Sequence, residues 1–284
     1  MKKKPKYSPK SEKKIDAPKS FSRKVKDDKV PLPRFKKIEV MNAETGIRLN
    51  KYIANSGVCS RRDADKLIEK GEIQVNGVVV TELGMKVSAT DKVVYKGEKL
   101  IPVIDPIYIL MNKPKDTITT TNDPEGRKTV MDLIEGSFEE RLYPVGRLDR
   151  NTTGVLLLTN DGELAQRLTH PKRVVQKVYV AELDKPITDA DITKLVTGVE
   201  LEDGIMVVDK AAMPSPKQRN VVGLEIHSGR NRIIHRTFEA LGYKVLKLDR
   251  VLFANLDKRR INRGEWRTLT SKELKSLRTS LGLI

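Results

Sequence analysis

The sequence predicts an α+β protein, in which a small helix–helix–hairpin domain precedes a larger domain built on a mixed or antiparallel sheet. Two observations carry this prediction. Within residues 47–100, apolar residues at helical spacing are followed by an Asn-Gly hairpin signal. After residue 105, strand-like runs alternate irregularly with capped helices. We therefore divide the 284-residue chain into 1–45, 46–104 and 105–284.

Residues 1–45 are the most basic part of the chain. They hold 15 Lys or Arg and 6 Asp or Glu, with only scattered apolar residues such as Ile15, Phe21 and Phe35. Because such a segment buries too little apolar surface to offset its loss of conformational entropy, we expect a disordered basic arm. The sequence leaves open whether this arm contacts a specific polyanion or only keeps the protein in solution.

The segment 46–104 predicts two helices followed by a small sheet. The signals, in chain order, are the helical spacing of Leu49, Tyr52 and Ile53, the capping box Ser60 to Asp63, the left-handed helix exit at Gly71, the hairpin turn Asn76-Gly77, and a strand over 93–95.

The segment 105–284 predicts a larger sheet covered by helices. Apolar or β-branched enrichment predicts strands over 108–111, 155–158, 177–181, 221–226 and 245–248. Helices are expected over 163–168, after a capping box at Thr188, over 232–241, and after a capping box at Thr270. Residues 101–106, which contain two prolines, are expected to link the domains.

Composition favours a polyanionic partner and argues against several other classes of protein. The formal net charge is +17, and each Lys or Arg near a phosphate releases condensed counterions. Cys59 is the only cysteine, which excludes an intramolecular disulfide and a cysteine-based zinc site. No apolar run of about 18 residues could span a bilayer, and no apolar signal-peptide core follows the basic start. We expect a soluble, cytoplasmic protein without a membrane partner.

Three runs within the first domain point to RNA. They are Arg48-Leu49-Asn50-Lys51-Tyr52-Ile53-Ala54, Ser60-Arg61-Arg62-Asp63-Ala64 and Gly71-Glu72-Ile73-Gln74-Val75-Asn76-Gly77. Together they resemble the RNA-binding domain first named in a small-subunit ribosomal protein, here called the S-four-type domain. The positions imply RNA contacts by Lys51, Arg61, Arg62 and Lys66, because guanidinium groups and helix N-terminal amides bind phosphates. The alternative is an ordinary solvated helix face, and Cys59 is interpreted as a small packing residue.

The most informative run is Tyr143-Pro144-Val145-Gly146-Arg147-Leu148-Asp149-Arg150-Asn151-Thr152-Thr153-Gly154, followed by an apolar strand and Thr159-Asn160-Asp161-Gly162. It resembles the active-site motif of the RsuA/RluB/RluE/RluF family of pseudouridine synthases. Further matches are Leu110-Met111-Asn112-Lys113-Pro114, Lys177-Val178-Tyr179-Val180, Gly229-Arg230-Asn231-Arg232 and Leu248-Asp249-Arg250-Val251. The resemblance covers about residues 47–278, in the family's own domain order, which is far more specific than one motif.

Asp149 is the expected catalytic carboxylate. It follows a glycine that permits a tight backbone path, and the neighbouring Arg147 and Arg150 favour a charged side chain that can act as nucleophile or base. A lone aspartate in such a turn would instead be expected to cap backbone amides. The resemblance implies that Asp149 acts on the sugar or the base of a flipped uridine, so that the N-glycosidic bond breaks and uracil rejoins through carbon five.

Tyr179 matches the family's active-site tyrosine. Its ring offers an aromatic face to the flipped base, and its hydroxyl can take part in proton transfer. The alternative is an aromatic residue on the surface of an alternating strand.

Position 235 departs from the family pattern, in which a basic residue, most often arginine, pairs with the catalytic aspartate. Here His235 takes that place, and Arg236 follows about 100° further around the helix. Three outcomes stay open: a protonated His235 pairs with Asp149, Arg236 reaches the site, or the pairing is lost and the enzyme is slow or inactive.

The resemblance implies neither a metal nor an organic cofactor, and the histidines at 170, 227 and 235 show no metal-ligand spacing. Arg147, Arg230 and Arg232 are expected to contact RNA. We expect the chain to be a monomer and its partner to be ribosomal RNA. The Lys-rich arm and residues 220–231 favour the large subunit.

The sequence leaves two alternatives to an enzyme. A non-catalytic RNA-binding or ribosome-assembly protein could retain the fold, but such a protein has no need of an aspartate like Asp149 near RNA phosphates. A general DNA-binding protein is least favoured, because the sequence contains no DNA-reading motif.

Overall fold

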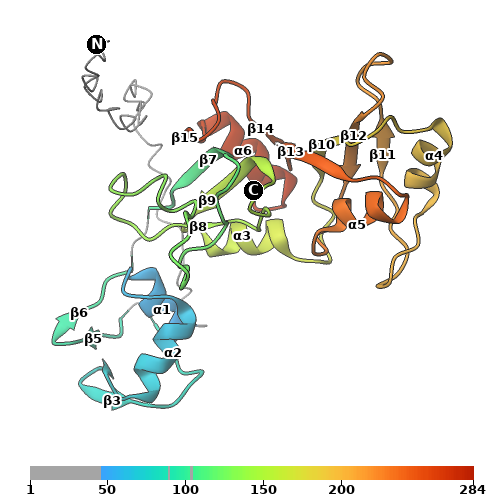
Figure 1. Ribbon diagram of the computed structural model, residues 1–284. Coiled ribbons are helices and arrows are strands. Elements are labelled where there is room, and N and C mark those ends of the chain that lie inside the picture. Colours follow the sequence, from blue (N-terminus) through green and yellow to red (C-terminus); the bar gives the residue numbers. More distant parts are fainter. Residues whose placement is uncertain (1–45, 89, 103–104) are drawn as a thin grey trace, which may run out of the picture. The chain divides into compact units, whose positions relative to one another are not determined.

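The computed structural model describes residues 46–88, 90–102 and 105–284 (Figure 1). The arm expected at 1–45 therefore lies outside the described residues. The described chain forms a smaller N-terminal unit and a larger C-terminal unit, each built on its own sheet. The predicted α+β class, with a mixed sheet in the larger unit, is confirmed.

The N-terminal unit contains two helices and six short strands. Its elements are β1 (Ile47–Arg48), α1 (Leu49–Asn55), α2 (Arg61–Glu69), β2 (Ile73–Val75), β3 (Val78–Val80), β4 (Lys86–Val87), β5 (Val93–Tyr95) and β6 (Glu98–Lys99). Strands β3, β2, β5 and β6 form an antiparallel sheet in that order, and β1 pairs with β4.

The local signals of this unit act as predicted, with one difference. Ser60 caps α2 by accepting a hydrogen bond from the Asp63 amide at 3.1 Å, but the Asp63 carboxylate accepts from the Ser60 hydroxyl at 2.6 Å, so it does not close the other half of a capping box. Asn76 and Gly77 both have positive φ, 53° and 86°, as a two-residue turn between twisted strands requires. Cys59 packs against the core of this unit, as expected.

The C-terminal unit is built on one nine-stranded sheet. The strands are β7 (Tyr108–Lys113), β8 (Tyr143–Pro144), β9 (Thr153–Thr159), β10 (Lys177–Leu183), β11 (Lys210–Ala212), β12 (Val221–Ile226), β13 (Val245–Phe253), β14 (Leu256–Asp257) and β15 (Trp266–Thr268). The main order is β11-β12-β10-β13-β9-β7-β15, with β14 beside β13 and β8 beside β9. Strands β9 and β13 run parallel, and the other described pairs of this sheet are antiparallel.

Both faces of the central strands are buried, which explains why β9 is a continuous apolar run rather than an alternating one. Leu156 and Leu158 face one core with helices α4 (Asp189–Thr197) and α5 (Ile233–Ala240). Val155 and Leu157 face the other core with α3 (Gly162–Thr169) and α6 (Ser271–Ser280). Figure 1 shows α4 and α5 near the β11–β12 end of the sheet and α3 near β8 and β9.

Three sequence-based boundaries differ from the structure. The strand expected over 245–248 continues to Phe253, so the Leu248–Val251 match lies inside β13 rather than after it. The strand expected over 155–158 begins two residues earlier. The helix expected over 232–241 spans Ile233–Ala240. It cannot include Arg232, because this residue has a left-handed backbone conformation (φ 45°, ψ 29°).

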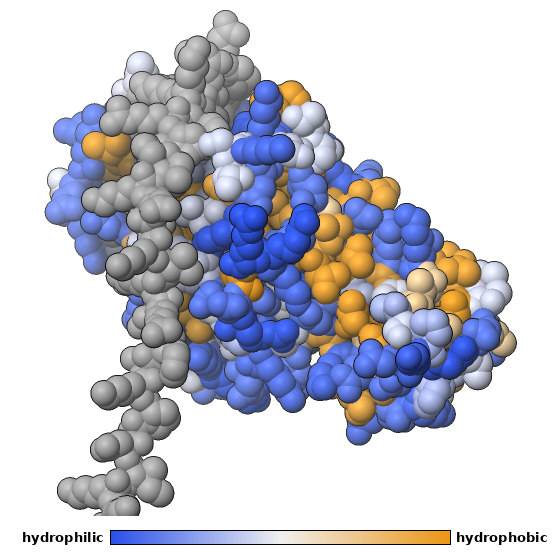
Figure 2. All heavy atoms as spheres, turned by 90° about the horizontal axis from the view of Figure 1, so that it is seen from above, coloured by the Kyte–Doolittle hydropathy of each residue, from blue (hydrophilic) through white to orange (hydrophobic). Residues whose placement is uncertain are grey.

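The visible face in Figure 2 is largely hydrophilic, with smaller hydrophobic areas between the polar ones. Among the described residues, Val174, Ile101 and Ile205 are the most exposed large apolar side chains, and they lie far apart in the sequence. Within the same residues, every helix is too short or too polar to cross a membrane.

Candidate active site

Asp149 lies on the loop between β8 and β9, and the backbone on both sides of it is held in place. Buried Leu148 accepts a hydrogen bond from the Thr119 hydroxyl at 2.9 Å through its carbonyl, while its amide approaches the same hydroxyl at 3.2 Å. The Thr152 amide donates to the Asp149 carbonyl at 3.0 Å. The loop is therefore an ordered turn that presents a half-exposed carboxylate.

Lys113, at the end of β7, holds this loop through hydrogen bonds to its backbone. Its side chain is fully buried, and its ammonium donates to the carbonyls of Asp149 and Arg150 at 3.1 Å and Thr152 at 2.8 Å, as well as to its neighbour Pro114. Burial lowers the pKa of Lys113 to about 8, and the Asp149 charge opposes that shift. The side chain is therefore mainly an ammonium at neutral pH. In the sequence, Lys113 lies within the matched run 110–114, and no pattern there indicates this role.

Replacing Lys113 by methionine is expected to disorder the Asp149 loop. The variant keeps the length of the side chain but removes the ammonium that donates to these carbonyls, and a buried acceptor left unsatisfied, such as the Thr152 carbonyl, costs about 1–3 kcal/mol. We expect a lower melting temperature and a large loss of activity. Lys115→Met, at an exposed position two residues away, is the matched control and should change neither quantity. A Lys113→Met enzyme with normal melting temperature and rate would contradict this role.

Two side chains from the start of α5 approach the Asp149 carboxylate. Asp149 Oδ2 lies 3.9 Å from His235 Nδ1 and 4.0 Å from Arg232 Nη1. Within the described residues the Asp149 carboxylate accepts no hydrogen bond. The side chain therefore does not cap backbone amides of its turn, which was the alternative to a catalytic role. Burial, then the Arg232 charge, lower the pKa of His235, against the opposing effects of Asp149 and Glu239.

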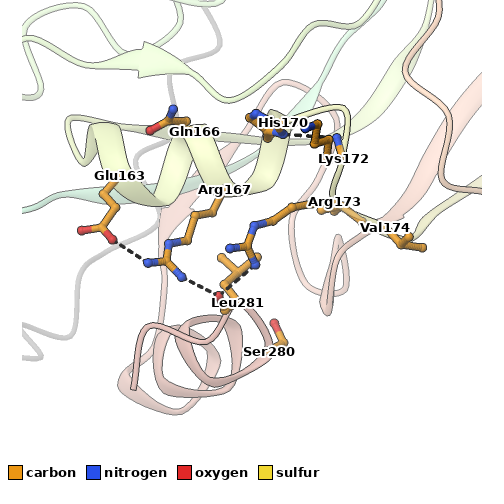
Figure 3. Close-up of a pocket in the computed structure, with 10 residues that line it drawn as sticks. Glu163, Gln166, Arg167, His170, Lys172, Arg173, Val174, Ser280 and Leu281 are labelled. Atoms are coloured by element: carbon orange, nitrogen blue, oxygen red, sulfur yellow. Dashed lines mark hydrogen bonds and ion pairs between the residues drawn. The ribbon is translucent and has the colours of Figure 1, made fainter.

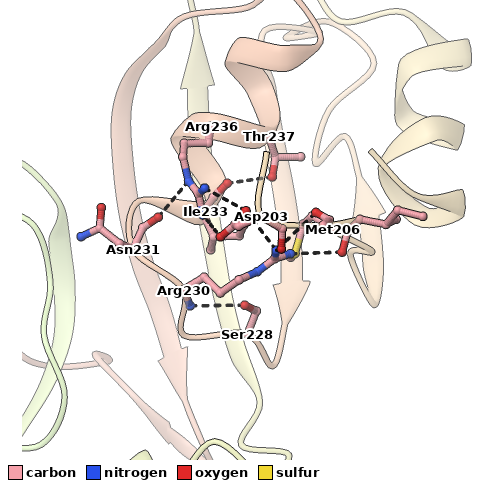
Figure 4. Close-up of polar contacts among 10 residues, drawn as sticks. Asp203, Met206, Ser228, Arg230, Asn231, Ile233, Arg236 and Thr237 are labelled. Atoms are coloured by element: carbon pink, nitrogen blue, oxygen red, sulfur yellow. Dashed lines mark hydrogen bonds and ion pairs between the residues drawn. The ribbon is translucent and has the colours of Figure 1, made fainter. Parts of the chain in front are cut away.

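Arg236 does not reach Asp149. Its guanidinium forms two hydrogen bonds to the carboxylate of Asp203, at 2.9 and 3.0 Å, and a third to the Asn231 carbonyl. Arg230 also converges on Asp203 and donates to the backbone carbonyls of the following loop residues, as Figure 4 shows. In this structure Asp203 therefore holds Arg236, and the basic side chains beside Asp149 are His235 and Arg232.

Tyr179 lies in β10 and is 8% exposed, within the same apolar core as Leu148 and the first turn of α5. It pairs with Arg250 of β13, and Arg250 pairs in turn with Gly154, at the start of β9. One strand, β13, therefore separates Tyr179 from the start of β9, where the Asp149 loop ends. The alternative of a surface aromatic residue is wrong, because the side chain is buried.

The predicted RNA-contacting side chains differ in their surroundings. Arg61, Arg62 and Lys66 are exposed on α2, where Lys66 pairs with Asp63 at 2.8 Å, and Lys51 is partly exposed on α1. Arg147 is exposed next to Asp149, whereas Arg150 pairs with Asp116. Arg230 is used within the protein, as described above, and Arg232 faces Asp149.

A separate hollow of about 730 Å³ lies between α3 and the end of α6 (Figure 3). Arg167 and Arg173 each donate to the Leu281 carbonyl, at 3.0 and 3.3 Å, and Arg167 also pairs with Glu163. These arginines satisfy the last turn of α6, where free carbonyls attract cations. None of the predicted site residues lines this hollow.

Acidic, histidine and cysteine side chains in the described part of the chain form no cluster with the arrangement of a metal site. Two of the three histidines have other contacts. His227 pairs with Asp209 at 2.8 Å, and His170 accepts a hydrogen bond from the Lys172 amide.

Comparison with known proteins identifies both units. Residues 107–240 match the model of the RNA pseudouridylate synthase family, and residues 47–93 match the S4 domain model. The chain is 44% identical to ribosomal large subunit pseudouridine synthase B of Bacillus subtilis over 81% of this chain and 95% of that protein. It is 37% identical to the dual-specificity RNA pseudouridine synthase RluF of Salmonella typhi over 82% of this chain and 79% of that protein.

A solved structure supports the same assignment. A crystal structure of a pseudouridylate synthase aligns with 81% of this chain and 99% of its own, with a TM-score of 0.60 and 29% identity. The fold, the S4 domain and the extent of these matches agree with the resemblance that the motifs indicated. The chain therefore belongs to the RNA pseudouridine synthase family and is an isomerase with an N-terminal S4 domain.

Proposed function

We propose that this protein converts a specific uridine of large-subunit ribosomal RNA to pseudouridine in the cytoplasm, as a step of ribosome biogenesis. The observation that carries the proposal is the half-exposed Asp149 carboxylate on a loop whose backbone is fixed by Lys113 and Thr119. The choice of RNA is supported by the S4 domain and by the Bacillus subtilis relative, whose name specifies the large ribosomal subunit.

In the proposed reaction the uridine leaves its stack, at a cost of a few kcal/mol, and enters the site beside Asp149. The carboxylate acts as nucleophile or base while the bond between the sugar and N1 breaks. Uracil turns and bonds to the sugar through C5, which loses its proton as N1 gains one, so the product is an isomer and no co-reactant is consumed. Tyr179 lies in the adjoining core and is proposed to border the base with its ring and to assist proton transfer with its hydroxyl.

Substrate binding is assigned to both domains, with proposed boundaries of 46–104 and 105–284. Lys51, Arg61, Arg62 and Lys66 would contact phosphates from the S4 domain, and Arg147 would do so beside the reacting nucleotide. Because these contacts are ionic, affinity for RNA should fall steeply as salt concentration rises. The protein is proposed to act as a monomer, which light scattering of the purified chain would test.

Substrate choice can be tested with purified protein and unmodified transcripts of the small- and large-subunit RNAs. Pseudouridine is mapped by carbodiimide labelling and primer extension. We expect one new pseudouridine in the large-subunit transcript and none in the small-subunit transcript. Modification of the small-subunit RNA alone would contradict the choice of target. Tight binding of both RNAs with no pseudouridine in either would favour a non-catalytic RNA-binding protein.

A further inference from the structure

Three arginines lie within or just before α5, and two of them are committed elsewhere. Arg230 and Arg236 both bind Asp203, and Arg230 also donates to the carbonyls of Gly204 and Ile205 (Figure 4). Arg232 has a different partner, because it points to Asp149 across a gap of 4.0 Å between Nη1 and Oδ2. From this segment, therefore, it is the arginine that faces the catalytic carboxylate.

The backbone at Arg232 is shaped for this contact. Its φ of 45° and ψ of 29° lie in the left-handed region, which residues with a Cβ seldom occupy outside turns and functional sites. The position precedes the first turn of α5, where asparagine, serine or glycine would be the better helix cap, and the Arg232 side chain forms no capping hydrogen bond. Local helix formation therefore does not explain an arginine here, whereas its place beside Asp149 does.

His235 is equally near to Asp149 but differs in charge. Its Nδ1 lies 3.9 Å from Oδ2, is buried, and has no hydrogen-bond partner within the described residues. The charged groups around it are Arg232 before the helix, Glu239 one turn on, and Asp149 on the facing loop. Burial and then Arg232 lower the pKa of His235, so the imidazole is neutral at neutral pH. A neutral imidazole at this distance forms no ion pair.

We propose that Arg232, a positioning residue for Asp149, supplies the cation that faces the Asp149 carboxylate, while His235 packs against the same carboxylate as an uncharged side chain. A guanidinium group is a permanent cation in proteins, and this one lies 4.0 Å from Oδ2, where it can orient the carboxylate. Glu239 lies 3.9 Å from the other terminal nitrogen of Arg232 and holds the guanidinium between two carboxylates. This inference rests on the proposed role of Asp149.

The first test compares Arg232→Gln with His235→Gln in single-turnover assays with saturating enzyme in excess over RNA, at pH 8. Loss of an oriented charged donor in an active site typically costs about 100-fold in rate, and we expect that loss in Arg232→Gln. Arg232→Lys should recover a large part of the rate, because the charge remains. His235→Gln should stay within about threefold of the wild type, since it replaces one neutral polar side chain by another. Arg259→Gln, which removes an exposed arginine paired with Asp257, is the control for general charge loss.

A double variant separates position from charge. Arg232→Gln combined with His235→Arg moves the guanidinium to the helix position and should restore most of the rate lost in Arg232→Gln. RNA affinity, measured by filter binding, should match that of Arg259→Gln in every variant. If Arg232→Gln weakens RNA binding but keeps the saturating rate, Arg232 is a phosphate contact and the inference is wrong. Equal losses in His235→Gln and Arg232→Gln would also overturn it.

The pH profile provides a readout that a structural defect would not imitate. If Arg232 is the cation, lowering the pH from 8 to 6 should change the saturating rate of the wild type and of His235→Gln in the same way. A rise on acidification that disappears in His235→Gln would make protonated His235 the cation and refute the inference. Absence of any wild-type conversion would instead refute the proposed function, because every comparison above is made relative to an active wild type.

Discussion

Replacing Asp149 by asparagine is expected to reduce pseudouridine formation by at least about 1,000-fold, the scale of loss when a catalytic nucleophile is removed. Asparagine keeps the shape of the side chain, and the loop is held by Lys113 and Thr119 through its backbone, so the fold should not change. Single-turnover conversion of large-subunit RNA measures the rate, and filter binding measures affinity. Affinity should be retained or slightly higher, because a negative charge near RNA phosphates is removed.

A matched control distinguishes the chemistry from a general effect of lost charge. Asp189→Asn alters an exposed carboxylate, with 80% of its side chain accessible, at the start of α4 in the same domain. It should leave the rate within about twofold of wild type. An Asp149→Asn enzyme that retains a tenth of the wild-type rate would show that the carboxylate is not the catalytic group.

Replacing Gly154 by alanine is expected to unfold the sheet around the active site. A Cβ at this position would lie 2.1 Å from the Arg250 carbonyl oxygen and 2.7 Å from the Arg250 nitrogen, and φ is 110°. Both contacts are with backbone atoms of Arg250, so rotation of a side chain cannot relieve the clash. The parallel pairing of β9 with β13 must therefore separate, which we expect to cost about 3 kcal/mol or more.

The single tryptophan, Trp266 on β15, reports on this domain in a urea titration followed by fluorescence. Gly264→Ala is the control, because its φ of 87° is also positive but nothing lies within 4 Å of the added Cβ. It should cost about 1 kcal/mol from backbone strain alone. Equal urea midpoints for the two variants would show that the β9–β13 approach is not as close as described.

Local signals in the sequence predicted those elements that depend on neighbouring residues. The Asn76-Gly77 turn requires only two left-handed backbone positions, and the Thr270 capping box closes within one helical turn, where both of its hydrogen bonds are present. The apolar run in β9 indicated a strand buried on both faces. The order of the strands was not predictable in this way, since the pairing of β9 with β13 joins residues almost 100 positions apart.

The same distinction applies to the site. The motif around Asp149 was recognisable, but the sequence could not show that Lys113 would donate to three carbonyls of that loop. A lysine just after the apolar run 107–111 was the available signal. Nor could spacing along the chain decide between Arg232, just before α5, and Arg236 within it, because Asp203 on a distant loop binds Arg236 whereas Arg232 faces Asp149.

The most direct test of the central claim is made in cells of the source organism that lack this gene. Pseudouridine is mapped across all ribosomal RNA after complementation with the wild-type gene or with the Asp149→Asn form at equal protein level. The account predicts that one large-subunit position loses pseudouridine without the gene, regains it with wild type, and does not regain it with Asp149→Asn. Full modification of that position by the Asp149→Asn protein would contradict the account.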